Sequence, residues 1–403
     1  MDIAVIGTLK KENEHRVPIH PNHIQEIPFN IRQHLFFEKG YGIPFGMDDA
    51  QIVALTGNEL LERQELFAKF KGIVITKPII EDFEEMQEGT LVWGWIHSVQ
   101  QELIAQIAID KKLTLIAWEN MNYESSRELL HIFNKNNEMA GYCGVQHALQ
   151  LKGIDGLFGA KRKVVVISHG SVSRGALFAL QGHNFTDITV YTQRPTYLVA
   201  NKIPGVDYKQ IVNGSIAGLK TVKLASNNKA FLEELLCADI IVNGMLQNTN
   251  NPVNFIHDGD VEKFKKPCLI IDISCDEGMG FDFAIPTTIK DPILSIGKVA
   301  YYGVDHTPTL LWNSASWEIS KCVLPYLPHV VDGSYNEVLR NAIDVKDGII
   351  VNEEILSYQN RSIKSPYEIV KVIKVVPPKI LVKVDQKNLS KNERTSNISH
   401  QLK

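Results

Sequence analysis

Two side chains that can move protons stand at the ends of apolar runs early in the chain. Lys77 lies near the end of the run 72–78, and His97 ends the run 90–97. A desolvated lysine and a histidine can both donate or accept a proton near neutral pH. Arg16 lies in a charged segment between apolar neighbours, where its guanidinium can bind a carboxylate through two parallel hydrogen bonds. The trio predicts acid–base chemistry on a small molecule that carries a carboxylate.

Each member of the trio also has a purely structural interpretation. A lone arginine commonly forms a surface salt bridge, a lysine can lay its alkyl stem along apolar surface, and a histidine can be a satisfied core residue. Two proton-moving groups on successive strand ends favour the functional interpretation. Glu119 ends a third run, 113–119, and is expected either to orient one of these cations at the substrate or to be a surface acid. His306 is expected beside the substrate, at a hinge.

A dinucleotide-binding unit is predicted in the middle of the chain. The β-branched run 163–167 indicates a strand buried on both faces, and a short loop leads from it into a helix. Glycines there would let a pyrophosphate approach the helix N-terminus. The residues expected to contact the cofactor are Ser168, Gly170, Ser171, Val172 and Gly175. Because Ser168 stands where the first glycine of G-x-G-x-x-G is usual, an ordinary strand–turn–helix without a ligand is the alternative.

The type of cofactor is indicated by the end of the next predicted strand, 187–192. A free ribose 2′-hydroxyl would usually meet an acid there, but the chain offers Arg194, which suits a 2′-phosphate. NADP(H) is therefore favoured over NAD(H), and a solvated loop cation is the alternative. The later strands 238–244 and 268–274 end in polar groups expected on the nicotinamide side. These are Asn243, Asp272 and Asp276, of which Asp276 could be only a turn residue.

Composition narrows the class of protein. A chain of 403 residues is long enough for two domains, and a net charge of −4 gives no reason to expect nucleic acid. The start of the chain lacks the features of a signal peptide, and no apolar run is long enough to span a membrane, so a cytoplasmic location is expected. The cysteines show no paired spacing, so neither disulfides nor a metal site is predicted. Homo-oligomer formation stays open.

The order of the elements predicts how the chain divides. The segment 126–152 has helical spacing with small residues at its centre, and 309–324 reads as a second helix that carries the chain back. The fold class is therefore α/β, with two Rossmann-like doubly wound domains, of which the substrate domain is discontinuous. The predicted boundaries are 1–130 with 325–385 for the substrate domain and 131–324 for the NAD(P)-binding domain. Two short strands are expected within 371–384, and the polar tail 386–403 is expected to be disordered.

The order of motifs resembles the alanine dehydrogenase and transhydrogenase amino-terminal superfamily. Arg16, Lys77 and His97 fall where that family has its substrate arginine, catalytic lysine and catalytic histidine. Within the superfamily, the segments 140–145, 272–276 and 305–311 resemble most closely carboxyethylornithine synthase and lysine-forming saccharopine dehydrogenase. The spacing of the two loop glycines also suits the synthase. Ser168 and the proline after Lys77 depart from the family pattern, which bears on the identity of the substrate.

The resemblance implies a reductive condensation, in which an amino-acid amine and a 2-oxo acid are joined and NADPH reduces the product to a secondary amine. Two other activities stay open. One is a simple amino-acid dehydrogenase that uses ammonia. The other is a catalytically silent NADP-binding module that acts as a sensor or scaffold.

Overall fold

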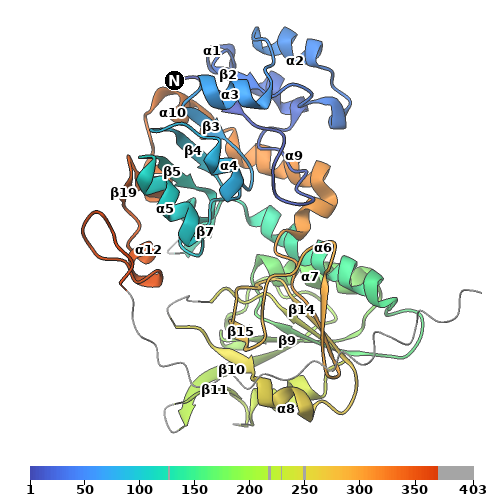
Figure 1. Ribbon diagram of the computed structural model, residues 1–403. Coiled ribbons are helices and arrows are strands. Elements are labelled where there is room, and N and C mark those ends of the chain that lie inside the picture. The colour runs from blue at the N-terminus through green and yellow to red at the C-terminus, as the bar shows by residue number, and fades with distance from the viewer. Residues whose placement is uncertain (126–127, 217–218, 228, 248–250, 371–403) are drawn as a thin grey trace, which may run out of the picture.

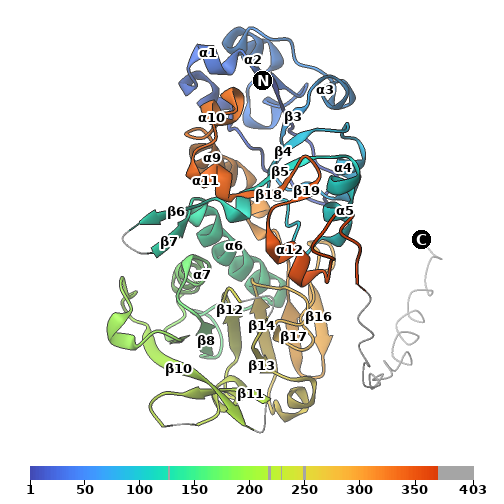
Figure 2. The ribbon, with the colours of Figure 1, turned by 90° about the vertical axis from the view of Figure 1, so that its left-hand side faces the viewer.

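Two lobes, each built on its own sheet, make up the protein in this computed structural model (Figure 1). It describes residues 1–125, 128–216, 219–227, 229–247 and 251–370. Helix α6, Asn134–Lys152, lies between the two sheets (Figure 2). The segments for which short strands and a disordered tail were predicted, 371–384 and 386–403, lie outside the described residues. Within the described residues, no helix is both long and apolar enough to cross a bilayer.

The sheet of the first lobe has the strand order β19-β18-β5-β4-β3-β1-β2. Its parallel strands are β1 (Ile3–Val5), β2 (Leu35–Phe37), β3 (Gly72–Val74), β4 (Leu91–Gly94) and β5 (Thr114–Ala117). The antiparallel strands β18 (Ile343–Lys346) and β19 (Ile349–Ile350) join it from the far end of the chain. The first sheet is thus assembled from both ends of the sequence, which confirms the predicted discontinuous lobe.

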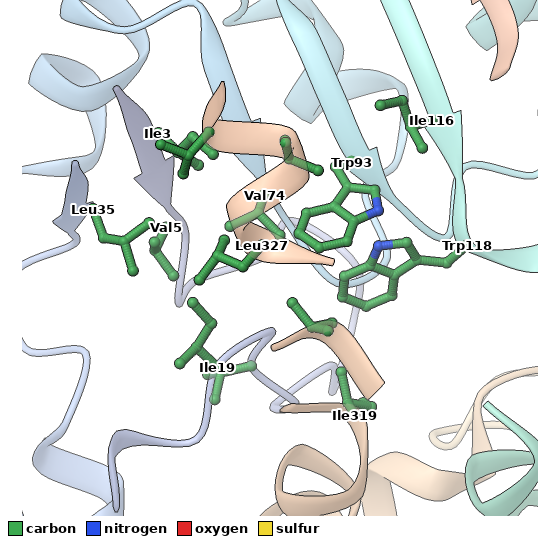
Figure 3. Close-up of a cluster of buried hydrophobic side chains, with 14 of the residues drawn as sticks. Ile3, Val5, Ile19, Leu35, Val74, Trp93, Ile116, Trp118, Ile319 and Leu327 are labelled. Atoms are coloured by element: carbon green, nitrogen blue, oxygen red, sulfur yellow. The ribbon is translucent and has the colours of Figure 1, made fainter. Parts of the chain in front are cut away.

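Helices cover both faces of this first sheet. They are α1 (Phe29–Arg32), α2 (Asp49–Thr56), α3 (Arg63–Lys69), α4 (Ile80–Glu84), α5 (Glu102–Asp110), α10 (Leu327–Asp332), α11 (Glu337–Asn341) and α12 (Glu353–Tyr358). Side chains alternate between the two faces, as strand geometry requires. Val74 and Trp93 pack in one core cluster, shown in Figure 3, and Ile73 and Val92 pack in another. Burial on both faces explains why these strands read as continuous apolar runs.

The sheet of the second lobe has the strand order β11-β10-β9-β8-β12-β14-β17-β16. The strands are β8 (Lys163–Ile167), β9 (Asp187–Thr192), β10 (Asp207–Ile216), β11 (Leu219–Leu224), β12 (Ile240–Asn243), β14 (Cys268–Asp272), β16 (Ile293–Ile296) and β17 (Val299–Tyr302). From β10 through β17 the order is parallel, and the hairpin partners β11 and β16 add antiparallel strands at the two edges. The predicted α/β class with two doubly wound sheets is confirmed.

Smaller elements complete the second lobe and the connections. Helices α7 (Ser171–Gly182) and α8 (Phe231–Leu236) flank the sheet, and β13 (Asn254–Ile256) pairs with β15 (Gly280–Phe281). Short 3₁₀ helices span Pro21–Glu26, Ile43–Phe45, Trp118–Asn120, Thr196–Leu198, Asp258–Lys263 and Thr307–Leu311. Helix α9 (Trp312–Val323) leads the chain back to the first lobe, as predicted for 309–324.

The predicted helix over 126–152 is only partly correct. Residues Asn122–Ser125 (β6) and Glu128–His131 (β7) form an antiparallel hairpin, and α6 begins at Asn134. Short apolar stretches fit a strand and a helix equally well, so periodicity alone misplaced the start of this helix. The exact domain boundaries, 1–130 with 325–385 and 131–324, remain our proposal.

Small residues let α6 approach the second lobe closely. A Cβ atom added to Gly141 would lie 1.8 Å from the carbonyl oxygen of Val172, and one added to Gly175 would lie 1.7 Å from that of Glu138. Either atom would force the helices apart. The predicted close approach at the centre of α6 is confirmed, and Gly175 of α7 takes part in it.

Candidate active site

Three adjacent strand ends in the first lobe bring together the predicted acid–base residues. Strands β3, β4 and β5 are parallel and in register. Lys77, His97 and Glu119 each follow shortly after the end of one of these strands. Since the carboxyl ends of parallel strands share one edge of the sheet, this topology places all three residues along that edge. The positive charge of Lys77 also contributes to the pKa shift of His97, which indicates that the two side chains are near each other.

Lys77 is bound to a residue from the second lobe. Its Nζ donates to the backbone oxygen of Asp305 at 3.2 Å and lies 3.3 Å from Oδ2 of the same residue. Lys11 donates to that Oδ2 at 2.9 Å, so two ammonium groups share one carboxylate. Burial alone would raise the pKa of Asp305, but Lys77, His306 and Lys11 outweigh it and hold this pKa far below its usual range. Asp305 is therefore an anion that fixes both lysines.

His97 is held in an uncommon backbone conformation. Its φ of 53° lies in the left-handed region, which few residues other than glycine adopt. Burial, followed by the charge of Lys77, lowers the pKa of its imidazole to about 3. No hydrogen bond to its ring nitrogens is found among the described residues. The imidazole is therefore neutral, its nitrogens are open to a hydrogen bond from a substrate, and the charge of Lys77 disfavours its protonated form.

Glu119 supports the backbone around His97. Its carboxyl oxygens accept hydrogen bonds from the backbone N–H groups of His97 and of Ile96, the latter at 3.2 Å. Burial and then the nearby Asp344 raise the pKa of Glu119 to about 8. The structure thus brings Glu119 to the site as a residue that holds the His97 segment, and direct contact with a substrate stays a prediction.

Arg16 is buried and already has a carboxylate partner. Its Nε donates to Oε1 of Glu14 at 2.7 Å, its second terminal nitrogen forms an ion pair with Oε2, and the other donates to Asn136 at 3.1 Å. The guanidinium also lies 5.1 Å from the ring centre of Trp95. Burial opposes ionisation of Glu14, but Arg16 outweighs it and lowers the pKa of that carboxyl. Only those N–H groups of Arg16 that are not used in these contacts can donate to a substrate carboxylate.

The Arg16 segment is tied to the Lys77 segment and to the hinge. Thr76, next to Lys77, donates from its hydroxyl to the backbone oxygen of Arg16 at 3.1 Å. His306 contacts Asp305 Oδ1 through Nδ1 at 2.6 Å and the backbone oxygen of Glu12 through Nε2 at 2.9 Å. With 4% exposure, His306 joins the two lobes. Its contact with a substrate stays a prediction.

The loop after β8 has the geometry of a phosphate-binding turn. Ser168 adopts a φ of 81°, a conformation usual for glycine. The backbone at this position thus has the conformation of a glycine although the residue is a serine. Gly170 precedes the first turn of α7, and a Cβ added there would meet only the Ser168 hydroxyl, at 4.0 Å. Ser171 and Val172 begin the helix, whose first N–H groups have no helical acceptor. The space and donors fit a pyrophosphate.

Positive charge surrounds this loop. Burial lowers the pKa of His169, and the charges of Arg174 and Arg194 lower it further, so both arginines are close to the loop. The side chain of Arg194 is exposed just after β9. These features fit an anionic cofactor, whereas Gly175 faces α6, and its predicted contact with the cofactor stays a prediction.

The nicotinamide-side residues separate into two groups. Asn243 donates to Asp272 Oδ1 at 2.9 Å, and Tyr301 donates to Oδ2 at 3.0 Å. Burial raises the pKa of Asp272 to about 7. Asp276 lies apart from this buried pair and is exposed. Partial removal of its carboxyl group from water raises its pKa, and the charge of Lys77 opposes this rise. Asp276 therefore lies within reach of the charge of Lys77.

A cavity of about 500 Å³ extends along the carboxyl edge of the first sheet beyond β1 and β2. Its lining includes Gly7, Lys11, Glu14, Glu38 and Trp312. Lys11 and Glu14 also contact Asp305 and Arg16, so the cavity shares walls with the acid–base site. Sequence reasoning missed this cavity and the roles of its residues. The only available signal was the dense charge of the segment 10–16.

Comparison with known proteins agrees with this geometry. Residues 7–140 match the family described as alanine dehydrogenase/PNT, N-terminal domain, and residues 151–358 match the C-terminal domain of the same family. The chain belongs to the alanine dehydrogenase/PNT family. Members of this family are oxidoreductases that bind a nicotinamide dinucleotide, so the predicted dehydrogenase class and cofactor class are confirmed.

Individual relatives have low sequence identity to this chain, but the matches extend over most of each relative's length. An N(5)-(carboxyethyl)ornithine synthase of Clostridium botulinum is 27% identical over 348 residues, which cover 83% of this chain and 94% of that protein. An alanine dehydrogenase of Methanococcus maripaludis is 24% identical over 83% of this chain and 89% of its own length. A solved L-alanine dehydrogenase superposes with a TM-score of 0.69 at 19% identity, covering 89% of this chain and 99% of that structure. The structural likeness confirms the two-domain fold.

Proposed function

We propose that this family member catalyses a reductive condensation, in which the amine of an amino acid and the carbonyl of a 2-oxo acid become a secondary amine. The observation that carries the proposal is the arrangement of Lys77 and His97 on adjacent strand ends beside Asp305. Its alternative, a dehydrogenase that uses ammonia, is supported by the similarity to alanine dehydrogenases. The similarity to carboxyethylornithine synthases supports the condensation.

The residues of the site can supply each proton transfer. The remaining donors of Arg16 would hold the oxo-acid carboxylate, and Lys77 would polarise the carbonyl by donating to its oxygen. Neutral His97 would accept a proton as the amine nitrogen bonds to the carbonyl carbon. It would return a proton to the carbinolamine oxygen, which leaves as water and gives a C=N bond. Asp305 would keep the two lysines in place throughout.

The cofactor would lie on the Gly170 loop. When bound, the reduced nicotinamide supplies the hydride that converts the C=N bond to the secondary amine. Ser168, Ser171 and Val172 would hold the pyrophosphate, and Asn243 and Asp272 would line the nicotinamide side. We favour NADP(H), because Arg194 and Arg174 place positive charge next to the loop, where a 2′-phosphate would add negative charge.

The cavity near the acid–base residues is the place that we propose for an organic substrate. The cavity of about 500 Å³ beside Lys11 and Glu14 is large enough for an amino acid and opens next to the acid–base residues. We also propose that the protein is cytoplasmic and acts on small amino and oxo acids.

A substrate-pair screen tests the function. NADPH oxidation would be followed with pyruvate or 2-oxoglutarate as the oxo acid and with ammonium, ornithine or lysine as the amine donor. We expect oxidation that requires both an oxo acid and a diamino acid. Oxidation with ammonium alone as the amine would favour the dehydrogenase. NADPH binding without oxidation in any combination would indicate the catalytically silent module.

A further inference from the structure

The segment that follows α12 contains two buried polar side chains. Gln359 and Arg361 are 6% and 5% exposed, although they lie just beyond residue 358, where the family match ends. Buried polar groups of this kind are normally held by specific hydrogen bonds. The partners of these two residues lead to His97.

Gln359 binds the chain immediately after His97. Its Nε2 donates to the backbone oxygen of Ser98 at 2.8 Å and to that of Val99 at 3.0 Å. Both amide hydrogens are thereby used on successive carbonyls of one turn. The backbone oxygen of His97 itself accepts from the N–H groups of Gln100 and Gln101, which closes this turn.

Arg361 fixes the orientation of Gln359. Its Nε donates to Oε1 of Gln359 at 2.6 Å, so the amide nitrogen must face the Ser98 and Val99 oxygens. The guanidinium is itself held by Gln106 of α5 at 2.8 Å and by the backbone oxygen of Tyr367 at 3.1 Å. The arrangement therefore links the C-terminal segment, α5 and the turn.

Other elements hold the same turn from different directions. Glu119 accepts from the backbone on the N-terminal side of the turn, and Asp344 of β18 accepts from the hydroxyl of Ser98. His97 has a left-handed backbone, an unfavourable conformation that persists where the surroundings determine it. Gln359 supplies the only side-chain donor to the Ser98 and Val99 carbonyls among the described residues.

We propose that Gln359, oriented by Arg361, is a positioning residue for His97, and that the segment beyond α12 is thereby part of the catalytic apparatus. Gln359 does not contact the substrate. It fixes the turn that begins at His97. The inference rests on the proposed role of His97 in proton transfer.

Gln359→Glu tests the proposal, because it keeps the shape of the side chain and an acceptor for Arg361 but removes both donors to the turn. With the substrate pair found in the screen, we expect kcat to fall about 10- to 100-fold, since small displacements of a catalytic group have effects of this size. The KM of the oxo acid and the Kd of NADPH should not change. Lys364→Ala is the matched control, because Lys364 is an exposed residue of the same segment, and its kcat should stay near that of the native protein.

Histidine NMR gives a readout that does not depend on the substrate. In protein labelled at histidine Cε1, the His97 signal, assigned from its loss in His97→Gln, should titrate at a higher pH in Gln359→Asn, which adds no charge, because a loosened turn admits water and weakens the burial that lowers this pKa. Lys77, Lys11, Arg16 and Asp305 also act on this titration and are unchanged in the variant. If Gln359→Glu does not fold, Gln359→Asn, which keeps the amide but shortens its reach, takes its place.

Native kcat and an unmoved His97 titration in a folded Gln359 variant would overturn the inference. Equal losses of kcat in Lys364→Ala would also overturn it, because they would show a general structural effect. The failure of the proposed function is distinguishable, since full activity in His97→Ala would remove the role of His97 whatever Gln359 does.

Discussion

Nζ of Lys77 lies 3.3 Å from Oδ2 of Asp305, although 228 residues separate them in the chain. Lys77 follows a strand of the first sheet, and Asp305 follows the last strand of the second, β17. The pair joins the two lobes at the point where the acid–base residues gather. It also places one anion beside both Lys11 and Lys77.

Replacement of Asp305 tests this pair. Asp305→Asn leaves Lys11 and Lys77 close together without their shared carboxylate, so the two ammonium groups repel each other. We expect turnover to fall at least about 10-fold and the melting temperature to decrease. Asp291→Asn, an exposed acid in a loop before β16, is the control. Unchanged turnover and melting temperature in Asp305→Asn would show that the pair has no role.

The acid–base assignment predicts large losses from single substitutions. General acid–base catalysis contributes roughly 10²- to 10⁴-fold, so His97→Ala and Lys77→Ala should each lower kcat by at least about 10²-fold. NADPH binding, measured by fluorescence titration, should stay intact, because both residues lie in the first lobe. His183→Ala, which alters a surface pair with Asp155 on the second lobe, should keep native turnover. Near-native turnover in both site variants would remove the assignment.

The raised pKa of Glu119 predicts how stability depends on pH. In the folded protein this pKa is about 8, whereas an unfolded glutamate titrates at about 4.3. Between these values the folded state binds more protons than the unfolded chain, so this residue makes the protein less stable as the pH rises. Glu119→Gln removes the titration.

Thermal unfolding of both proteins across that pH range checks this prediction. The melting temperature of the native protein relative to that of Glu119→Gln should be highest near about pH 5 and should fall toward about pH 8. A difference that is constant with pH, or one that grows as the pH rises, would mean that Glu119 ionises normally.

Arg194 predicts the choice between the two nicotinamide cofactors. A hydrogen bond to a charged group is worth about 1.5–3 kcal/mol, so Arg194→Ala should weaken NADPH binding about 10-fold or more. NADH binding should stay the same, because NADH lacks the 2′-phosphate. Lys161→Ala, at the amino end of β8 and away from the loop, should affect neither cofactor. Equal weakening of both cofactors in Arg194→Ala would contradict the preference for NADP(H).

The strands were the most predictable part of the fold. The run 187–192 coincides with β9, and 163–167 with β8, because strands buried on both faces are apolar throughout and end in polar residues. The hairpins β10–β11 and β16–β17 were not foreseen. Polar residues interrupt β10 and β11, so these strands lack a continuous apolar signal, and β16 and β17 are runs of only four residues each.

Residues of the site could be predicted from the sequence only where their position relative to a strand marked them. Lys77 and His97 stand out because each follows an apolar strand. The partnership of Lys77 with Asp305, and that of Arg16 with Glu14, depend on tertiary contacts that no local pattern encodes. Gly175 was singled out as a residue near the cofactor because it is a glycine. In the structure it packs closely against Glu138 of α6, a contact that the local sequence does not indicate.

Product analysis under competition tests the central claim most directly. The protein would be incubated with NADPH, pyruvate, ornithine and ammonium together, and the products would be identified by mass spectrometry. We predict a secondary amine that contains the carbon skeletons of both pyruvate and ornithine. Alanine as the sole product would contradict the condensation and assign the protein to the ammonia-dependent dehydrogenases.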